Sequence, residues 1–277
     1  MTKNNLTGLN RSVIDKYYTT ENTVKICYDL IMKNLKINKV KDLCIEPSAG
    51  NGSFIKYIKL LCNNCNFYDL EPEHKEICKI DYFKFNFNEM IKNQYNKKHV
   101  IGNPPFGRQS SLAIKFIKKS AEYADTISFI LPKSFKKKSL QKHFPLNFHL
   151  ICDYELPINS FIVGNKEHNV PCVFQIWIKK KNNRAITDKV MPKNFKFVKK
   201  EEPHDISFRR VGVYAGKIDK NTQDKSFQSH YFIKFDILLT EELFLKISKI
   251  VYSGCNNTVA AKSISKGEII EEFNKIL

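Results

Sequence analysis

A pair of prolines between an amide and an aromatic side chain is the part of this sequence that most suggests chemistry. The run Asn103-Pro104-Pro105-Phe106-Gly107 follows residues 99–102, which are predicted to form a short buried strand. Each proline fixes its φ angle and carries no backbone N–H, and the residue before a proline is held extended. We therefore predict that the carbonyl oxygens of Asn103 and Pro104, and the side-chain oxygen of Asn103, face outward as acceptors beside the Phe106 ring.

A strand end with these acceptors suits a flat ring that bears an exocyclic amino group, as adenine does. That nitrogen is a poor nucleophile because its lone pair is delocalised into the ring. Acceptors that hold the amino hydrogens favour a more tetrahedral nitrogen as it attacks a methyl donor, so they stabilise the transition state more than the ground state. The alternative is that these residues only form the turn that ends a strand, because clusters of Pro and Gly mark turns.

A site for a methyl donor is suggested by a glycine-rich turn nearer the N-terminus. Residues 41–45 predict a strand and residues 53–61 a helix, with Glu46-Pro47-Ser48-Ala49-Gly50-Asn51-Gly52 between them. Glycines allow a tight turn and close approach of a ligand, but the turn lacks both G-x-G-x-x-G and a P-loop lysine, which disfavours NAD and ATP. Glu46 suits a sulfonium amino acid better than a pyrophosphate. An ordinary turn between a strand and a helix is the alternative.

Two further acids follow predicted strands. Asp69 lies near the end of the strand at residues 65–70, about twenty residues after the glycine turn, where an acid suits ribose hydroxyls. Asp81 could accept a hydrogen bond from an adenine amino group, with Tyr82 or Phe83 against the ring. A solvated acidic loop and ordinary core aromatics are the alternatives for these two segments.

The net charge of +18, with 46 Lys and Arg against 28 Asp and Glu, favours nucleic acid over a membrane as partner. Residues 92–142 hold twelve Lys or Arg and two acids, and they bracket the Asn-Pro-Pro-Phe run. Arg108 and Lys133 in this segment are candidate substrate-binding residues. AT-rich coding and a merely solvated basic surface would give the same composition. Nothing in the sequence indicates the oligomeric state.

Several classes of protein are disfavoured. No run of about 18 apolar residues is present, and no apolar stretch follows the N-terminus, so a soluble, cytoplasmic protein with reduced cysteines is expected. Cys62, Cys65, His74 and Cys78 are of the types that bind zinc. Their spacing fits no common zinc finger, so no metal site is expected.

Strands that alternate with helices predict a parallel sheet with crossover connections. Helices are expected at residues 21–35, 53–61 and 110–123, and two strands at 148–154 and 173–178 are expected to form a hairpin at the sheet edge. Between those two strands lies a predicted polar loop that contains Phe161. The composition shifts at residues 179–200, which we interpret as a linker to strands at 206–215 and 231–235 and helices at 240–251 and 262–277.

Taken in order, these residues resemble the class I S-adenosylmethionine-dependent N6-adenine methyltransferases. Tyr17-Tyr18-Thr19 comes first, then the glycine turn, Asp69, Asp81-Tyr82 and Asn-Pro-Pro-Phe, over about residues 10 to 180. This is the order of the gamma-type DNA methyltransferases. The resemblance implies a Rossmann-like seven-stranded α/β sheet with helices on both faces. It also implies a catalytic domain in residues 1–183 and a small α+β extension, for substrate recognition, in residues 184–277.

The resemblance also implies roles for single residues. Asn103, Pro104, Pro105 and Phe106 would be catalytic, with Phe106 and Phe161 on either side of the target base. The S-adenosylmethionine site would comprise, in chain order, Tyr18, Thr19, Glu46, Pro47, Gly50, Gly52, Asp69, Asp81 and Tyr82.

Two features depart from the gamma-type pattern. Thr20 stands where those enzymes often have a proline, and residues 184–277 are fewer than their usual recognition domain. A site-specific DNA adenine methyltransferase is our leading interpretation. An RNA adenosine-N6 methyltransferase, acting on structured RNA or an mRNA cap, is the second. A nucleic-acid-binding module without activity is the third, and the intact Asn-Pro-Pro-Phe run counts against it.

Overall fold

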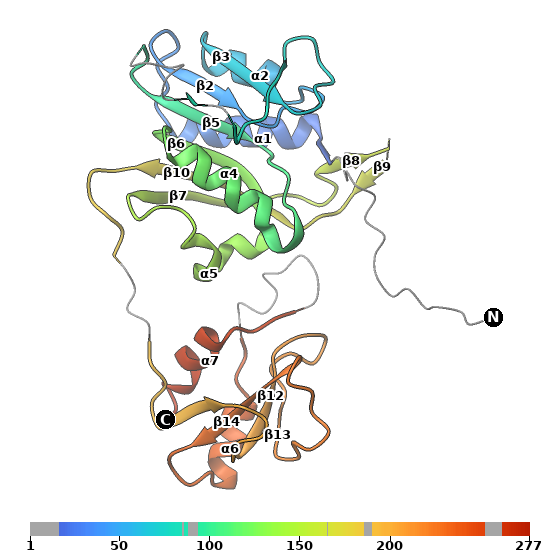
Figure 1. The fold of residues 1–277 in the computed structure, drawn as a ribbon, viewed down its shortest axis with the longest axis vertical. Helices are drawn as coiled ribbons and strands as arrows, with labels where there is room; N and C mark the ends of the chain where they lie inside the picture. Colours follow the sequence, from blue (N-terminus) through green and yellow to red (C-terminus); the bar gives the residue numbers. More distant parts are fainter. Residues whose placement is uncertain (1–16, 85, 88–93, 165, 186–189, 253–261) are drawn as a thin grey trace, which may run out of the picture. The chain divides into compact units, whose positions relative to one another are not determined.

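The computed structural model describes residues 17–84, 86–87, 94–164, 166–185, 190–252 and 262–277 (Figure 1). The chain divides into two compact units, each of which is described by itself. The first comprises Met1–Pro132 and His143–Asn183, and the second comprises Lys133–Lys142 and Arg184–Leu277. Residues 133–142, which we had placed in the catalytic domain, are thus part of the second unit. In the described residues, no helix is long and apolar enough to cross a membrane.

A seven-stranded sheet in the order β4-β3-β2-β5-β6-β10-β7 forms the centre of the first unit. Its strands are β2 (Leu43–Glu46), β3 (Cys65–Asp69), β4 (Cys78–Lys79), β5 (Lys98–Gly102), β6 (Thr126–Pro132), β7 (Phe148–Glu155) and β10 (Cys172–Lys179). The first five are parallel, whereas β10 pairs antiparallel with both β6 and β7. The predicted Rossmann-like sheet that ends in an antiparallel hairpin is confirmed.

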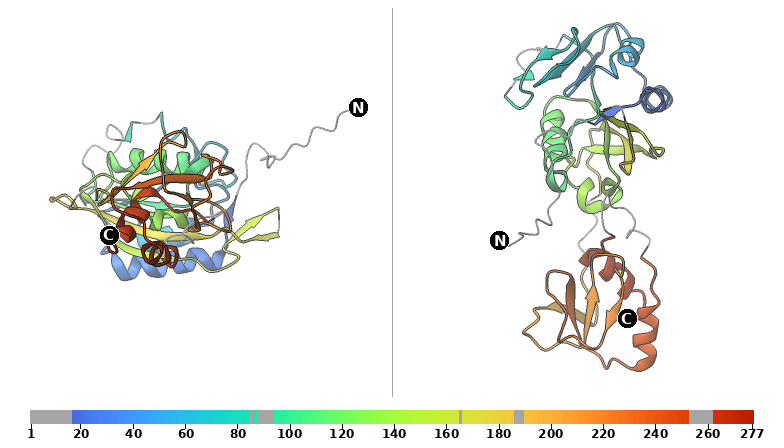
Figure 2. Two further views of the ribbon diagram at one scale, coloured as in Figure 1. Left: turned by 90° about the horizontal axis from the view of Figure 1, so that it is seen from below. Right: turned by 90° about the vertical axis from the view of Figure 1, so that its right-hand side faces the viewer.

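Helices cover both faces of this sheet, as predicted: α1 (Glu21–Asn34), α2 (Ile55–Leu61) and α4 (Ser111–Ala121). In the right-hand view of Figure 2, α1 and α4 lie on opposite sides of the strands. Strands β2 and β6 are buried along their whole length, which is typical of parallel strands covered on both faces.

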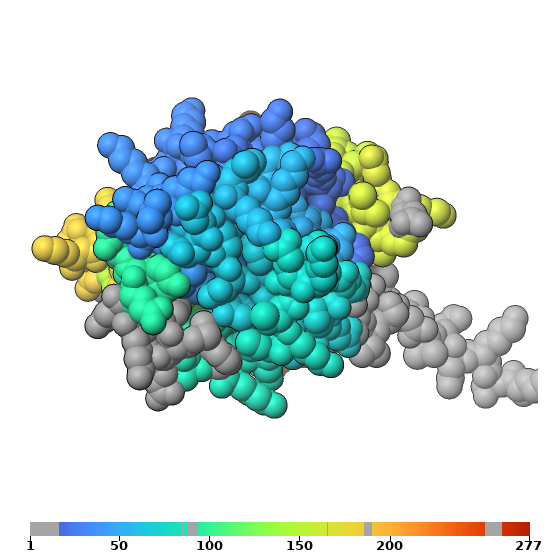
Figure 3. Space-filling view, turned by 90° about the horizontal axis from the view of Figure 1, so that it is seen from above, coloured from blue at the N-terminus to red at the C-terminus, as the bar shows by residue number. Residues whose placement is uncertain are grey.

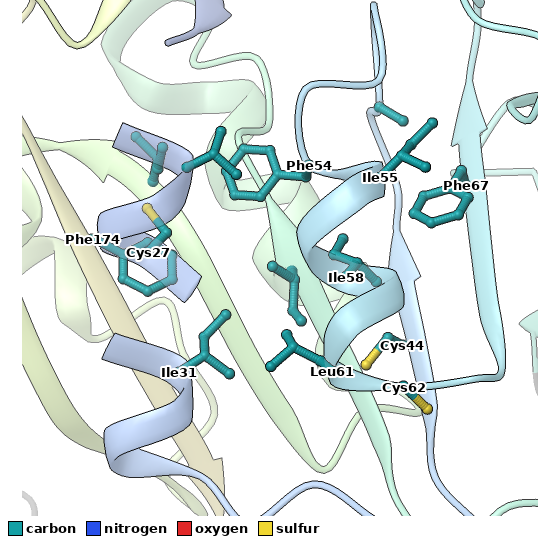
Figure 4. Close-up of a cluster of buried hydrophobic side chains, with 14 of the residues drawn as sticks. Cys27, Ile31, Cys44, Phe54, Ile55, Ile58, Leu61, Cys62, Phe67 and Phe174 are labelled. Carbon is teal, nitrogen blue, oxygen red and sulfur yellow. The ribbon is translucent and has the colours of Figure 1, made fainter. Parts of the chain in front are cut away.

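The apolar stripe of α1 explains why this helix packs on the sheet. Val24, Cys27 and Ile31 recur at helical spacing and are all buried, and the Thr20 side chain caps the helix by accepting from the Thr23 N–H. Cys27 and Ile31 lie in the same apolar cluster as Ile58 of α2 and Phe174 of β10 (Figure 4).

The segment between β7 and β10 is not the polar loop that we predicted. It forms a small antiparallel sheet of β8 (Phe161–Val163) and β9 (Lys166–His168), and β8 also pairs with β1 (Tyr18–Thr19). In Figure 3 this yellow-green hairpin stands beside the blue segment that holds β1. The pairing ties Tyr18 and Thr19 to the hairpin, so a segment early in the chain is fixed by one far along it.

The second unit is an antiparallel sheet in the order β11-β14-β12-β13 together with short helices. Its elements are η2 (Lys133–Lys136), α5 (Lys138–Gln141), β11 (Phe195–Val198), β12 (Ile206–Arg209), β13 (Ile218–Asp219), β14 (His230–Phe235), α6 (Glu241–Ser248) and α7 (Lys266–Phe273). Phe195, Phe208 and Phe273 lie in its core. The strand predicted at residues 206–215 ends at Arg209, and the predicted linker contains β11.

A buried polar network lies at the amino end of the parallel strands. His99 Nε2 is 3.2 Å from Asp42 Oδ2, and its Nδ1 is 2.8 Å from Thr126 Oγ1. Asp42 also accepts from the backbone N–H groups of Asn38 and Lys97. Burial lowers the pKa of His99, and this outweighs the opposite effect of Asp42.

We expect this network to make stability depend on pH. Because the folded-state pKa of His99 lies below the unfolded value of about 6.5, the unfolded state binds more protons, and stability is lost as pH falls below about 6.5. The loss cannot exceed about 1.4 kcal/mol per pH unit for one proton. Urea unfolding between pH 7.5 and 5 should show a smaller loss for His99→Gln than for the wild type. His149→Gln, at a half-buried histidine outside this network, should follow the wild type. Identical pH dependence in all three proteins would contradict this role.

Candidate active site

The carboxyl ends of β2, β3 and β5 meet at one edge of the sheet. β2 pairs with β3 on one side and β5 on the other, and the strand order reverses between β2 and β5. Ligands of open α/β sheets bind at this reversal, outside the carboxyl ends of the strands. Glu46, Asp69 and Asn103, which the sequence singled out separately, therefore lie on one edge.

Glu46 is the most deeply buried acid at this edge. Its exposed fraction is 2%, and its Oε2 has no hydrogen-bond partner among the described residues. Burial raises the pKa of Glu46, and the charge of Asp69 adds to the effect. Gly102 lies beside Glu46 and has a φ of +153°. A Cβ at this position would be only 3.2 Å from Glu46 Cγ. We had not predicted a role for Gly102, although its place directly before Asn-Pro-Pro is a usable signal.

Asp69 holds the glycine turn in place. Its Oδ2 accepts from the Gly50 N–H at 2.8 Å, and its Oδ1 accepts from the Glu71 N–H at 2.8 Å. Gly50 has a φ of +51°, and a Cβ there would be 3.5 Å from the Tyr18 ring. The Tyr18 hydroxyl donates to Glu73. Each carboxylate oxygen of Asp69 keeps a lone pair for a further donor, so the predicted contact with ribose hydroxyls is chemically compatible with this geometry.

Gly52 and Pro47 shape the turn from within. Gly52 has a φ of +84°, and a Cβ there would be 2.8 Å from Ile55 Cδ1 and 3.1 Å from His74 Cγ. Pro47 is buried at the end of β2. Gly52 is therefore needed for the conformation of the turn, whether or not a ligand contacts it.

Asn103, which directly follows β5, connects the end of this strand to the β1 segment. Its Nδ2 donates to Thr19 Oγ1 at 3.2 Å and to the Tyr17 carbonyl at 3.3 Å. Because a carbonyl only accepts, this side of the amide must be the nitrogen, and Oδ1 points the other way as an acceptor. The backbone oxygen of Asn103 accepts from Ser48 Oγ at 3.4 Å. This carbonyl thus has one local donor, and its role as an acceptor for the target stays a prediction.

Phe106 lies half-buried against the apolar cluster under α1 and α2, and Pro104 is buried while Pro105 is exposed. The turn that follows Phe106 has a strained backbone. Gln109 and Ser110 have φ angles of +52° and +62°, which cost L-residues of order 1–3 kcal/mol each and collect at functional sites. Arg108 is exposed in this turn.

Tyr82 is buried in the core of the first unit. Its ring is stacked on Phe116 at 5.3 Å, and its hydroxyl is 2.8 Å from Ser120 Oγ and 2.6 Å from the Tyr123 hydroxyl. The predicted contact between Tyr82 and a ligand was therefore wrong. Phe83, the alternative that we had considered, is partly exposed next to Asp81, whose carboxylate accepts from the Phe83 N–H at 3.1 Å.

Phe161 is also a core residue. Its exposed fraction is 1%, which leaves no ring face for a base, so the structure does not support its predicted stacking role. The Tyr17 ring packs edge-on against Phe161 at 6.3 Å and against His168 at 6.0 Å, and it is more than one third exposed. Because the Tyr17 carbonyl contacts Asn103, Tyr17 is an exposed aromatic residue near the predicted acceptor to which we had given no role. The pairing of β1 with β8 was the signal needed to find it.

The possible zinc ligands do not gather into one site in the described structure. The Cys62 and Cys65 thiols donate to the backbone oxygens of Asp42 and Cys62, and Cys78 is exposed on β4. Across the described residues, no group of three His, Cys, Asp or Glu side chains is placed to hold a metal ion. Lys133 belongs to the second unit, and its role stays a prediction.

Comparisons with known proteins give distant structural likenesses. No protein-family model and no curated protein matches the chain. It is similar to a candidate RNA methyltransferase from Pyrococcus horikoshii, with 19% identity and a TM-score of 0.48 over 62% of this chain and 90% of that one. It is also similar to a type I restriction-modification methyltransferase subunit from Streptococcus thermophilus, with 13% identity and a TM-score of 0.44 over 60% and 45% of the two chains.

A third likeness is to a candidate methyltransferase from Streptococcus mutans, solved in complex with SAH. The identity is 15% and the TM-score 0.35, over 57% of this chain and 97% of that one. All three TM-scores lie below 0.5, which is too weak a likeness to assign an activity or a substrate to this chain.

Proposed function

We propose that this chain is an S-adenosylmethionine-dependent methyltransferase that methylates N6 of adenine in DNA. The observation that carries the proposal is the orientation of Asn103. Hydrogen bonds from its Nδ2 to Thr19 and Tyr17 fix the amide, so that its Oδ1 is left as the acceptor side, three residues before the half-buried Phe106. An acceptor that is fixed beside an aromatic ring is what an adenine amino group requires.

The residues at the neighbouring strand ends fit S-adenosylmethionine. The buried Glu46 Oε2, which has no partner in the described part of the chain, is suited to a positively charged methionine group, and Asp69 retains acceptor capacity for ribose hydroxyls. Gly50 keeps open the space beside the Tyr18 ring. When bound, the cofactor would supply a methyl group on a sulfonium, which leaves as a neutral thioether.

The chain's own contribution to the reaction is positioning and polarisation. Asn103 Oδ1 would accept one amino hydrogen and hold N6 toward the methyl group, and Phe106 would hold the ring plane. The nitrogen forms the new bond to carbon with its lone pair, and its extra proton then passes to water. Since the hydrogen bond strengthens as positive charge develops on the nitrogen, Asn103 lowers the barrier rather than only binding the base.

The high lysine content supports nucleic acid as substrate, and the motif order supports DNA. Incubation of the full chain with radiolabelled S-adenosylmethionine and matched pools of DNA and RNA tests both parts. Label recovered as N6-methyladenine from DNA is the expected result. Label recovered only from RNA would replace DNA by RNA, and absence of label from adenine in both pools would overturn the proposal.

The cofactor part has its own test. Gly50→Val should weaken S-adenosylmethionine binding at least about tenfold, because a branched side chain would fill the space beside Tyr18. Gly164→Val is a matched control: its φ of +52° is almost that of Gly50, at +51°, but a Cβ there meets nothing within 4 Å. Calorimetry should therefore show near-normal binding for Gly164→Val. Equal affinities of the two variants would place the cofactor elsewhere.

A further inference from the structure

The segment of residues 71–76, between β3 and β4, packs on the glycine turn. The Glu73 N–H donates to the Gly50 carbonyl at 3.0 Å, and a Cβ on Gly52 would be 3.1 Å from His74 Cγ. The segment therefore contacts both glycines of the turn at which we place the cofactor.

From β1, the Tyr18 side chain reaches the same turn. A Cβ on Gly50 would be 3.5 Å from Tyr18 Cε1, which is van der Waals contact. The Tyr18 hydroxyl lies 2.7 Å from both Oε1 and Oε2 of Glu73, so it donates one proton between the two carboxylate oxygens. Tyr18, Glu73 and Gly50 thus form a closed ring of contacts that joins β1 to the segment of residues 71–76 beside the glycine turn.

The Tyr18–Glu73 hydrogen bond lies at the protein surface. Glu73 is exposed and Tyr18 is half-buried. At its Tyr18 end the bond is attached to β1, which has two residues, and at its Glu73 end to a segment of turns. Short elements with exposed hydrogen bonds open at little cost in free energy, because water replaces the partner that is lost. The bond can therefore break while the seven-stranded sheet stays intact.

We propose that Glu73 is a positioning residue of the S-adenosylmethionine site: it holds the Tyr18 ring beside the glycine turn, and its hydrogen bond to Tyr18 opens each time the cofactor enters or leaves. The inference rests on the proposed function, in which the cofactor lies against this turn. A cofactor approaches the backbone of such a turn closely, and loops that cover a site commonly set the rates of binding and release. A carboxylate suits the role, because a hydroxyl donates more strongly to a charged oxygen than to a neutral one.

Glu73→Ala should raise the association and dissociation rate constants of S-adenosylmethionine together, by about 3- to 10-fold, the range expected for the loss of one exposed hydrogen bond to a charged group. The dissociation constant should stay close to that of the wild type, since the bond is broken in the transition state for entry and for exit alike. Tyr18→Phe keeps the ring but lacks the hydroxyl, so it should raise the two rate constants by a similar factor. The double variant should match either single variant, because both substitutions remove the same bond.

Surface plasmon resonance with the immobilised full chain measures the two rate constants for S-adenosylmethionine, and calorimetry measures the dissociation constant. Tyr57→Phe is the matched control, because the Tyr57 hydroxyl also donates to a carboxylate, that of Glu21 at 3.4 Å, in the same unit. This control should bind S-adenosylmethionine with wild-type rate constants. Thermal unfolding should show wild-type melting temperatures for all variants, since the hydrogen bonds that they lack are exposed.

Two results would overturn the inference while the proposed function stands. One is a wild type that methylates adenine while Glu73→Ala and Tyr18→Phe bind S-adenosylmethionine with wild-type rate constants. The other is a weaker affinity of Glu73→Ala that comes only from faster release, which would show that Glu73 binds the cofactor directly. A wild type that binds S-adenosylmethionine but methylates no adenine overturns the proposed function, and the rate constants still decide the role of Glu73. A wild type that binds no S-adenosylmethionine overturns both.

Discussion

Asn103→Ala should lower the rate of methyl transfer to adenine by about 100- to 1,000-fold, which is the usual effect of removing one oriented polar group that acts in the transition state. The alanine side chain has no acceptor for the amino hydrogen, and the hydrogen bonds to Thr19 and Tyr17 that aim the amide are also lost. Single-turnover transfer from labelled S-adenosylmethionine to a DNA duplex measures the effect.

Asn103→Asp is the companion variant for this experiment. It keeps an acceptor for the target, but it places a carboxylate oxygen against the Tyr17 carbonyl, so we expect a smaller loss of rate than with alanine. Cofactor affinity by calorimetry should be close to normal in both variants, because the contacts of Glu46 and Asp69 are unchanged. A rate near that of the wild type for Asn103→Ala would remove this residue from the reaction.

Phe106→Ala should slow transfer about 5- to 100-fold, since stacking is worth ~1–3 kcal/mol per base. Phe106→Tyr should keep most of the activity because the ring face remains. An adenine inside a duplex must first be extruded, at a cost of a few kcal/mol. The deficit of Phe106→Ala should therefore shrink when the target adenine is mismatched and less pairing has to be broken.

A duplex with 2-aminopurine at the target position reports extrusion directly as a rise in fluorescence. The rise should be smaller for Phe106→Ala than for the wild type. Equal rises, together with equal rates on paired and mismatched DNA, would show that another ring supports the base. Tyr17, which is partly exposed and whose carbonyl contacts Asn103, is the first residue to examine in that case.

The parts of the site that could be predicted are those set by local sequence and by sheet topology. Glu46, Asp69 and Asn103 each follow an apolar strand, and the carboxyl ends of neighbouring parallel strands must share an edge. The roles of the aromatic residues were harder to predict, because their spacing in the sequence does not show whether an aromatic side chain points into the core or toward the site. Tyr82 finds its hydroxyl partners on Ser120 and Tyr123, and Phe161 is covered through the pairing of β8 with β1. Neither contact can be recognised from the sequence around these residues.

Short elements in polar sequence were missed for a related reason. β8 and β9 contain three residues each, which is too few to show a period, and the long-range pairing of β8 with β1 adds to their stability. The same holds for residues 133–142, which follow a strand of the first unit directly. We had placed them in the catalytic domain, with Lys133 as a substrate-binding candidate, whereas Lys137 donates to the Ser263 carbonyl and pairs with Glu268 in the second unit.

The membership of residues 133–142 in the second unit has a consequence for how the chain is assembled. The peptide chain passes between the units three times, after residues 132, 142 and 183. The second unit is therefore a discontinuous domain, and during synthesis its first segment leaves the ribosome long before α7, with which it pairs through Lys137 and Glu268. Cutting the gene at codon 183 would not separate two modules, because it would leave residues 133–142 in one product and the rest of their unit in the other. Exchange of this unit between related proteins would have to carry both segments together.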